Sequence, residues 1–168
     1  MSKLLIRELT LANFAKYGFF TNVLNVTGVS FESRYYSFFR DVSLMKVGTD
    51  MTAFSVCIIK KRPFVIDILE QHSKTHEAFI SLDGDALLQV APASQNGIPP
   101  MEDIEVFFVP KGILITLKCG VWHHAPFAYG CASSNILVVL PERTYANDCT
   151  TYEIEERCRP CIELDMHY

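Results

Sequence analysis

Short runs of β-branched and aromatic residues, separated by turn-forming residues, recur through most of the chain. Such runs are typical of β-strands, and glycine, proline, asparagine and aspartate between them are typical of the connecting turns. Seven runs span residues 54–59, 64–69, 79–82, 86–90, 104–109, 113–117 and 136–140. Helical patterns are confined to the ends, where Thr10 is placed to cap a segment through Tyr17 and residues 154–158 suit a turn. The pattern predicts an all-β sandwich or barrel with short terminal helices.

The turns between the runs have recognisable chemistry. Asp83-Gly84-Asp85 predicts a tight hairpin in which the glycine takes positive φ. The segment from Asn96 to Pro100 contains a glycine and two prolines and cannot continue a strand ladder. No repeat, low-complexity tract or flexible linker divides the chain, so we expect one domain over residues 1–168.

Charge and composition exclude several classes of partner. The formal net charge is -4 and no run of Lys or Arg forms a basic stripe, so nucleic acid is not expected. Lys3, Arg7 and Glu8 interrupt the segment where a signal peptide needs an unbroken apolar stretch. Nowhere do about 18 apolar residues run together, as a membrane span requires. We therefore expect a cytoplasmic protein that does not bind membranes.

Six cysteines are present, an even count that indicates disulfides only in a secreted chain. Reduced thiols are therefore expected. Cys158 and Cys161 form one C-x-x-C pair, but a structural zinc site usually takes a second pair or two suitably spaced histidines. The pair is a weak signal.

Two segments carry the residues with chemical potential. Strand residues two positions apart project to one face, so Glu70 and His72 share a face, which Glu77 rejoins after a turn. In the second segment Gly120 permits a tight turn and His123 follows three positions later. Two carboxylates in one cavity repel each other and lose hydration unless a cation or a proton compensates, which favours a functional site over a filler role.

Other polar and aromatic residues have plainer interpretations. Strand parity predicts that His76 and His124 lie on the opposite faces, exposed or behind the site. Trp122 is more typical of a core or interface anchor than of a substrate platform. Arg143 either binds a carboxylate through its two-pronged guanidinium or forms an ordinary surface pair with Glu142 or Asp148.

The spacing resembles the two cupin motifs. Glu77, with Gly84 after it and His72 five positions before it, is similar to the first motif, and Gly120 with His123 is similar to the second. Glu70 stands where the cupin pair usually has its first histidine. Lys118 stands where the second motif usually has a proline. The resemblance implies a jelly-roll barrel, also called a double-stranded β-helix.

The closer resemblance is to the ureidoglycolate lyase family, and it runs from about residue 14 to 149. The matching segments are Phe14 to Gly18, Glu70-Gln71-His72, Ala78-Phe79, Val121-Trp122-His123-His124, Glu142-Arg143 and Asn147-Asp148-Cys149. Three features depart from the family: Ala125 is inserted before Pro126, Glu77 replaces a common glutamine, and the early arginine segment has two candidate matches. Those candidates are Arg34-Tyr35-Tyr36 and Phe39-Arg40-Asp41.

The resemblance implies elimination of urea from ureidoglycolate to give glyoxylate, a late step in allantoin and purine breakdown. A base must remove the hydroxyl proton, an acid must protonate urea, and a cation should hold the substrate carboxylate. We hypothesise Glu77 or His72 as the base, His123 as the acid and Arg143 as the carboxylate clamp. No organic cofactor is implied.

Two other functions stay open at this point. The first is a metal-dependent cupin isomerase or dioxygenase, in which Glu70, His72, Glu77 and His123 bind a divalent transition metal. Metal binding is also the simpler way to neutralise the two carboxylates, although a shared proton would do the same. The second is a non-catalytic cupin that binds a small molecule. A homodimer formed through exposed strand edges is the default expectation for oligomeric state.

Overall fold

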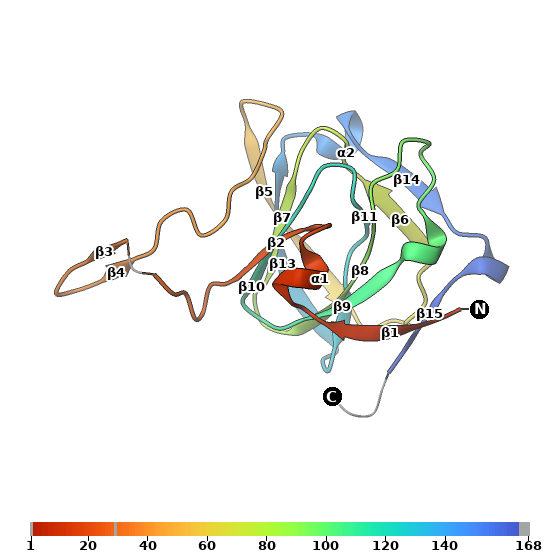
Figure 1. Cartoon of the computed structure of the whole chain (residues 1–168), viewed down its shortest axis with the longest axis horizontal. Helices are drawn as coiled ribbons and strands as arrows, with labels where there is room; N and C mark the ends of the chain where they lie inside the picture. Colours follow the sequence, from red (N-terminus) through yellow and green to blue (C-terminus); the bar gives the residue numbers. More distant parts are fainter. Residues whose placement is uncertain (1, 29, 165–168) are drawn as a thin grey trace.

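The computed structural model describes residues 2–28 and 30–164, which form two sheets that face each other as a flattened barrel (Figure 1). The eight-stranded sheet contains β1 (Lys3–Glu8), β6 (Ile68–Gln71), β8 (Asp85–Ala91), β9 (Glu105–Val109), β11 (Trp122–His123), β12 (Phe127–Tyr129), β14 (Thr150–Glu153) and β15 (Cys161–Glu163). The five-stranded sheet contains β2 (Gly18–Asn22), β5 (Thr52–Lys60), β7 (Glu77–Ser81), β10 (Ile113–Leu117) and β13 (Ser133–Pro141). A separate two-stranded hairpin joins β3 (Phe31–Glu32) to β4 (Ser37–Phe38).

Helical structure is short. The described helical segments are α1 (Leu11–Phe14), α2 (Thr144–Asn147) and the 3-10 turns η1 (Met101–Asp103) and η2 (Glu156–Cys158). Thr10 caps α1 as predicted, because its side chain accepts from the backbone of Asn13 while the Asn13 side chain accepts from the backbone of Thr10. None of the helices in the described ranges is long and apolar enough to cross a membrane.

The all-β prediction is confirmed, and the chain crosses repeatedly between the two sheets, as in a jelly-roll barrel. Five of the seven predicted runs fall within or overlap β5, β7, β8, β9 and β10, and a sixth coincides with β13. The run at residues 64–69 is only partly a strand, since β6 starts at Ile68 and Val65 forms an isolated bridge. Pro63 lacks the N–H that a ladder would need just before this run.

The hairpin predicted at Asp83-Gly84-Asp85 is wrong. Strand β7 pairs with β10 and β13, whereas β8 pairs with β9, β11 and β12, so the turn carries the chain from one sheet to the other. Gly84 does not take positive φ. It is needed for close packing instead, because a Cβ there would lie 3.0 Å from the Sγ atom of Cys131 and from the Cβ atom of Ser134.

The core has two layers, one inside the barrel and one outside the eight-stranded sheet. The inner layer includes Phe79, Ile136 and Val138, and the outer layer includes Trp122. Because neighbouring residues of a strand face opposite ways, Trp122 packs in the outer layer while His123 points into the barrel. The strand therefore positions a polar side chain inside an otherwise apolar interior.

Glu105 joins the N-terminal segment to the barrel. Its carboxylate lies 2.7 Å from the Nη1 atom of Arg7 and 2.8 Å from the Nζ atom of Lys16, and it accepts a 2.5 Å hydrogen bond from the Tyr17 hydroxyl. Partial burial alone would raise the pKa of Glu105, but these donors and charges lower it overall. The folded state therefore binds a proton at this group less readily than the unfolded chain does.

We expect Glu105→Gln to lower the free energy of unfolding by roughly 1 kcal/mol at neutral pH. The depressed pKa makes this contribution fully present above the ordinary glutamate pKa of about 4.3. The contribution is lost as pH falls through the folded value. Urea unfolding of both proteins from pH 7 to pH 3 should show their stability difference shrinking. Glu102→Gln, an exposed carboxylate of the same segment, is the control, and an equal loss in that variant would contradict the expectation.

Candidate functional site

The four predicted acidic and histidine residues come from both sheets and meet inside the barrel. Glu70 lies on β6 directly opposite His123 on β11, and His72 follows the end of β6. The chain then crosses to the five-stranded sheet, where Glu77 opens β7. The backbone N–H of Gly120, which has a φ of 77°, donates to the carbonyl of His72 at 2.7 Å and ties the two segments together.

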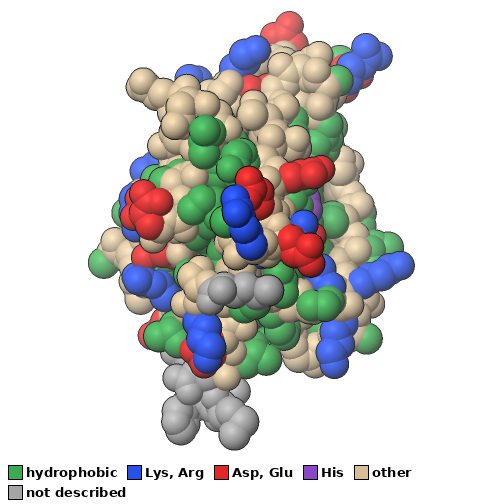
Figure 2. Space-filling view, turned by 90° about the vertical axis from the view of Figure 1, so that its right-hand side faces the viewer, with side chains coloured by type: hydrophobic (Ala, Val, Ile, Leu, Met, Phe, Trp, Pro, Cys, Tyr) green, Lys and Arg blue, Asp and Glu red, His purple; other side chains and the backbone are tan. Residues whose placement is uncertain are grey.

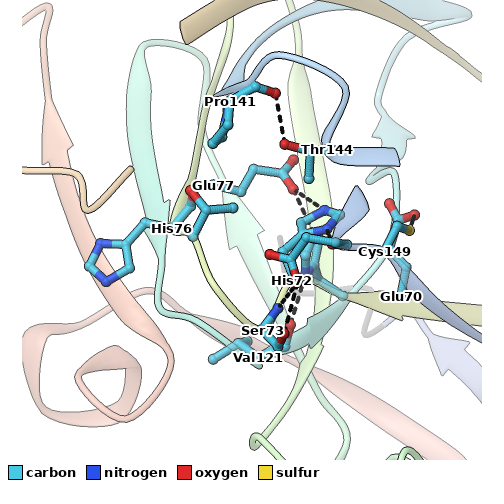
Figure 3. A network of polar contacts seen from close by, with 12 residues as sticks. Glu70, His72, Ser73, His76, Glu77, Val121, Pro141, Thr144 and Cys149 are labelled. Carbon is cyan, nitrogen blue, oxygen red and sulfur yellow. Dashed lines mark hydrogen bonds and ion pairs between the residues drawn. The ribbon is translucent and has the colours of Figure 1, made fainter. Parts of the chain in front are cut away.

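Glu77 is the centre of this cluster. Its Oε2 atom lies 2.8 Å from the Nε2 atom of His123 and 3.1 Å from the Nε2 atom of His72. All three residues are buried, with exposed fractions of 8% or less. Figure 3 shows the carboxylate of Glu77 pointing toward His72, while His76 points away from the cluster. The prediction that His76 lies outside the site is confirmed.

The other nitrogen of each histidine faces a backbone carbonyl. Nδ1 of His72 lies 2.7 Å from the carbonyl oxygen of Asp148, and Nδ1 of His123 lies 2.9 Å from that of Val121. A carbonyl oxygen only accepts hydrogen bonds, so each Nδ1 carries the proton. In a neutral ring the lone pair is then on Nε2, facing the Glu77 carboxylate. A proton or a metal ion must lie between these groups to offset the repulsion.

Electrostatics favours the charged pair of Glu77 and His123. Burial alone would raise the pKa of Glu77, but attraction to His123, its hydrogen bond and the neighbouring His72 ring lower it to about 2. Burial alone would lower the pKa of His123, but the charge and hydrogen bond of Glu77 raise it to about 9. The cavity thus stabilises a carboxylate beside an imidazolium.

The same residues fit a divalent metal. One ligand atom from each of Glu70, His72 and His123 lies within 4.8 Å of the others. The Nε2 atom of His72 is buried and makes no well-directed hydrogen bond despite its 3.1 Å distance to Glu77. Two imidazoles and a carboxylate suit Mn, Fe, Ni or Zn, and the carbonyls on Nδ1 orient the rings as metal-binding histidines require. Glu77 is not one of these three.

A small cavity of about 50 Å³ reaches the cluster. Glu70, Glu77 and His123 line its polar side, while Phe79, Ile136 and Val138 line its apolar side. Tyr145 of α2 also lines it and is 61% exposed, so the cavity opens to the surface beside this ring. The ring of Tyr145 packs edge-on against that of His72, with centroids 6.0 Å apart.

The prediction that His124 lies on the opposite face is wrong, because this histidine also lines the cavity. Strand β11 ends at His123 and the chain bends at Ala125, so strand parity does not extend to residue 124. The Nδ1 atom of His124 is buried and has no hydrogen-bond partner among the residues that the structure describes.

Arg143, the predicted carboxylate clamp, is not brought to the cluster. Its side chain is 76% exposed and lies 3.3 Å from the carboxylate of Glu142. Its backbone takes a φ of 58° and begins the turn of α2 that carries Tyr145 into the cavity wall. The arginine therefore lies on the same turn as a cavity residue but faces solvent.

The sequence did not single out Asp148 and Cys149 as site residues. The carboxylate of Asp148 accepts from the backbone and hydroxyl of Ser73 and from the backbone of Lys74, at 2.8 to 2.9 Å. The Cys149 thiol donates to Glu70 at 3.4 Å, and burial together with Glu70 raises its pKa to about 12. Both lie in a segment that matched the family, which was the available signal.

The structure shows no disulfide among the described cysteines that it gives as free thiols. Cys57, Cys119, Cys131, Cys149 and Cys158 are free thiols in the structure. Cys158 is exposed on η2, and its C-x-x-C partner Cys161 lies on β15. Neither belongs to the histidine cluster.

Comparison with solved structures finds oxalate decarboxylases. A mutant of the Bacillus subtilis enzyme has a TM-score of 0.42 and 17% identity, and the match covers 61% of this chain and 24% of that one. Another oxalate decarboxylase structure has a TM-score of 0.43 and 14% identity, with 66% and 27% covered. This chain spans about a quarter of their length, and its fold is assigned from its own strand order.

Comparison with sequences gives a family but no individual relative. No curated protein matches the chain. The family model for ureidoglycolate lyase matches residues 1–160, which include every member of the histidine and carboxylate cluster. This match covers nearly the whole sequence, in agreement with the segments from Phe14 to Cys149. The chain belongs to the ureidoglycolate lyase family.

Proposed function

We propose that this protein eliminates urea from ureidoglycolate and leaves glyoxylate. Membership of the ureidoglycolate lyase family supports the reaction. The observation that carries the proposal is the buried carboxylate of Glu77, held within 3.1 Å of two imidazole nitrogens at the end of a cavity. Such a cluster can move a proton between the two ends of a small substrate.

The reaction needs only a proton transfer and one bond cleavage. The substrate hydroxyl loses its proton and becomes the aldehyde oxygen of glyoxylate, while the carbon–nitrogen bond breaks. The bonding electron pair goes to the urea nitrogen, which gains a proton, so no oxidant or reductant is required. Glu77 takes the hydroxyl proton and can return it to the nitrogen, because removal and delivery of one proton balance.

We propose that Glu70, His72 and His123 hold a divalent transition metal. Such an ion would act as a Lewis acid on substrate oxygen atoms. The Nε2 atom of His123 cannot bind a metal and donate a proton at the same time. If a metal is held there, Glu77 is therefore the group that moves the proton from the substrate hydroxyl to the urea nitrogen. Without a metal, His123, whose Nε2 lies 2.8 Å from Glu77, is the acid that protonates the urea nitrogen.

We keep Arg143 as the proposed clamp for the substrate carboxylate. Its present partner is the exposed Glu142, and exposed ion pairs contribute only about 0 to 1 kcal/mol. A substrate carboxylate at the mouth of the cavity can therefore displace Glu142 at small cost. The position of Arg143 on the turn that carries Tyr145 supports this role.

A metal-dependent cupin isomerase or dioxygenase is the second candidate. The observation in its favour is the Glu70, His72 and His123 set, which is a ligand arrangement suited to several metals. A binding protein without catalysis is the third. The cytoplasmic location expected from the sequence remains part of the proposal.

The test is incubation of purified protein with racemic ureidoglycolate, with glyoxylate followed over time. We expect glyoxylate release that stops near half of the substrate, because a chiral site consumes one enantiomer. His123→Ala, which removes a ring that contacts Glu77, should release glyoxylate no faster than buffer. Binding of ureidoglycolate without turnover would indicate the binding-protein alternative. The absence of both binding and turnover would contradict the proposal.

A further inference from the structure

Asp148 and Cys149, which follow α2, contact two of the three proposed metal ligands. The backbone carbonyl of Asp148 accepts a hydrogen bond from Nδ1 of His72 at 2.7 Å, and the thiol of Cys149 donates to Oε2 of Glu70 at 3.4 Å. The partners are 76 and 79 positions apart in the sequence. Figure 3 shows the Cys149 sulfur beside the Glu70 carboxylate. One distant segment thus orients both ligands, and we call it the 148–149 segment.

The side chain of Asp148 also fixes the turn that follows His72. Its Oδ1 atom accepts from the backbone N–H and the hydroxyl of Ser73, at 2.9 and 2.8 Å. Its Oδ2 atom accepts from the backbone N–H of Lys74 at 2.8 Å. Hydrogen bonds to a carboxylate are shorter and stronger than those between neutral groups. Asp148 therefore holds the His72 ring through its carbonyl and the next two residues through its carboxylate.

The 148–149 segment is itself anchored on both sides. The backbone N–H of Asp148 donates to the carbonyl of Thr144 at 2.8 Å and closes α2, while Thr150 starts β14 and pairs with Gln71 on β6. β14 lies on the right-hand side of Figure 1, the side that faces the viewer in Figure 2. Figure 2 shows charged side chains of both signs intermixed there among the described residues, which does not indicate docking of a strongly charged partner. The contacts that distinguish the segment are those directed toward the ligands.

These contacts suit groups that orient metal ligands. Among the described residues, the Cys149 thiol is the one hydrogen-bond donor to the Glu70 carboxylate. A thiol is a weak donor, so it orients the carboxylate and leaves lone pairs available to a cation. The Asp148 carbonyl takes the Nδ1 proton of His72, and the buried Nε2 atom of the same ring makes no well-directed hydrogen bond. Loss of such an outer partner typically weakens metal affinity by about 10- to 100-fold.

We propose that Asp148 and Cys149 are positioning residues that pre-organise the proposed metal site. Asp148 turns Nε2 of His72 toward the cavity, and Cys149 holds a carboxylate oxygen of Glu70 within 4.8 Å of the imidazole ligand atoms. The inference rests on the proposed ligand set of Glu70, His72 and His123 and extends it to two residues outside the set. His123 does not depend on them, because its Nδ1 atom faces a carbonyl of its own segment.

Titration of chelator-stripped protein with Co²⁺, followed by visible absorption, tests the Cys149 thiol. We expect Cys149→Ala to bind Co²⁺ at least about tenfold more weakly than wild type, because Glu70 loses its donor. Cys149→Ser keeps a hydroxyl donor and should restore most of the affinity. Cys131→Ala is the matched control, since it removes a half-buried thiol that packs beside Gly84, and it should leave the affinity unchanged. An equal loss in Cys149→Ser and Cys149→Ala would make the sulfur itself a metal ligand and overturn the positioning role.

Asp148→Asn tests the clamp on the turn. The amide offers one acceptor atom fewer to the N–H groups of Ser73 and Lys74, so we expect the His72 ring to lose its fixed orientation and Co²⁺ affinity to fall about tenfold. Asp83→Asn is the matched control, because Asp83 accepts a backbone N–H and a hydroxyl at 2.8 Å beyond the other end of β7. Both variants should lower the urea midpoint of the metal-free protein by similar amounts, and only Asp148→Asn should lose Co²⁺ affinity.

Three further results would overturn the inference. Equal Co²⁺ affinity in wild type, Cys149→Ala and Asp148→Asn would show that neither residue positions a ligand. An equal loss of affinity in Asp83→Asn and Asp148→Asn would make the effect one of general stability. Wild-type protein that binds no Co²⁺ would refute the ligand set itself, whereas glyoxylate release by that protein would leave the proposed lyase reaction standing without a metal.

Discussion

Glu77→Gln is expected to lower kcat for ureidoglycolate by about 100- to 10,000-fold, the range over which a proton-transfer group contributes. The variant should still bind about one transition metal per chain, because the proposed ligand set is Glu70, His72 and His123. The amide occupies the same space as the carboxylate and has no basic oxygen to accept the hydroxyl proton. Glyoxylate release gives kcat. Elemental analysis of protein purified without chelator or a metal-affinity tag gives the metal content per chain.

Glu70→Gln is the matched variant, since it removes one negative charge from the same cavity. We expect this change to weaken metal binding at least tenfold, because it replaces a charged ligand with a neutral one. Equal loss of metal in both variants would make Glu77 a fourth ligand, as its spacing in the sequence suggested. Full activity in Glu77→Gln would contradict the role of Glu77 in proton transfer.

The strands that the sequence predicted are those whose apolar runs are bounded by turn residues. β8, β9, β10 and β13 are buried on one or both faces, which makes their composition distinctive. The turn at Gly120 was also predictable, since only its positive φ lets the segment after Lys118 return toward His72.

The strands that the sequence missed depend on distant partners. β1 runs parallel to β9 and β15, so its pairing joins residues 3–8 to residues more than 90 positions away. Its apolar residues are a run of three, Leu4 to Ile6, between charged residues, and so short a run carries little signal alone. β14 pairs with β6 and is mostly exposed. Local patterns cannot encode such contacts, because tertiary packing decides them.

The cluster itself was predicted from spacing, but its arrangement was not. Parity within one strand placed Glu70 and His72 together, whereas Glu77 reaches them from the facing sheet. The crossing between sheets explains why Glu77 lies against both imidazoles and outside the three-residue ligand group. His124 lines the cavity because β11 ends at His123, so the alternation of side chains within a strand does not extend to residue 124.

Trp122→Ala is expected to lower the free energy of unfolding by about 3 to 5 kcal/mol, the usual cost of deleting a buried aromatic side chain. Trp122 is fully buried in the outer core layer, and its Nε1–H donates to the hydroxyl of Ser94 at 2.8 Å. For a chain of this length the loss corresponds to a fall in Tm of roughly 10 °C. Trp122→Phe is the control, because it keeps an aromatic ring and loses mainly the indole hydrogen bond, worth about 1 kcal/mol.

The wild-type protein provides the second half of this test, because Trp122 is its only tryptophan. Its fluorescence reports on the outer layer beside β11, whereas far-ultraviolet circular dichroism reports on all the strands. If residues 1–168 form one domain, both signals should change at one urea midpoint, since the two core layers share the eight-stranded sheet. Separate midpoints would show that the outer layer unfolds on its own. In that case the free energy lost in Trp122→Ala would report the stability of the outer layer alone. The cluster around His123 should then keep its activity at urea concentrations above the fluorescence midpoint.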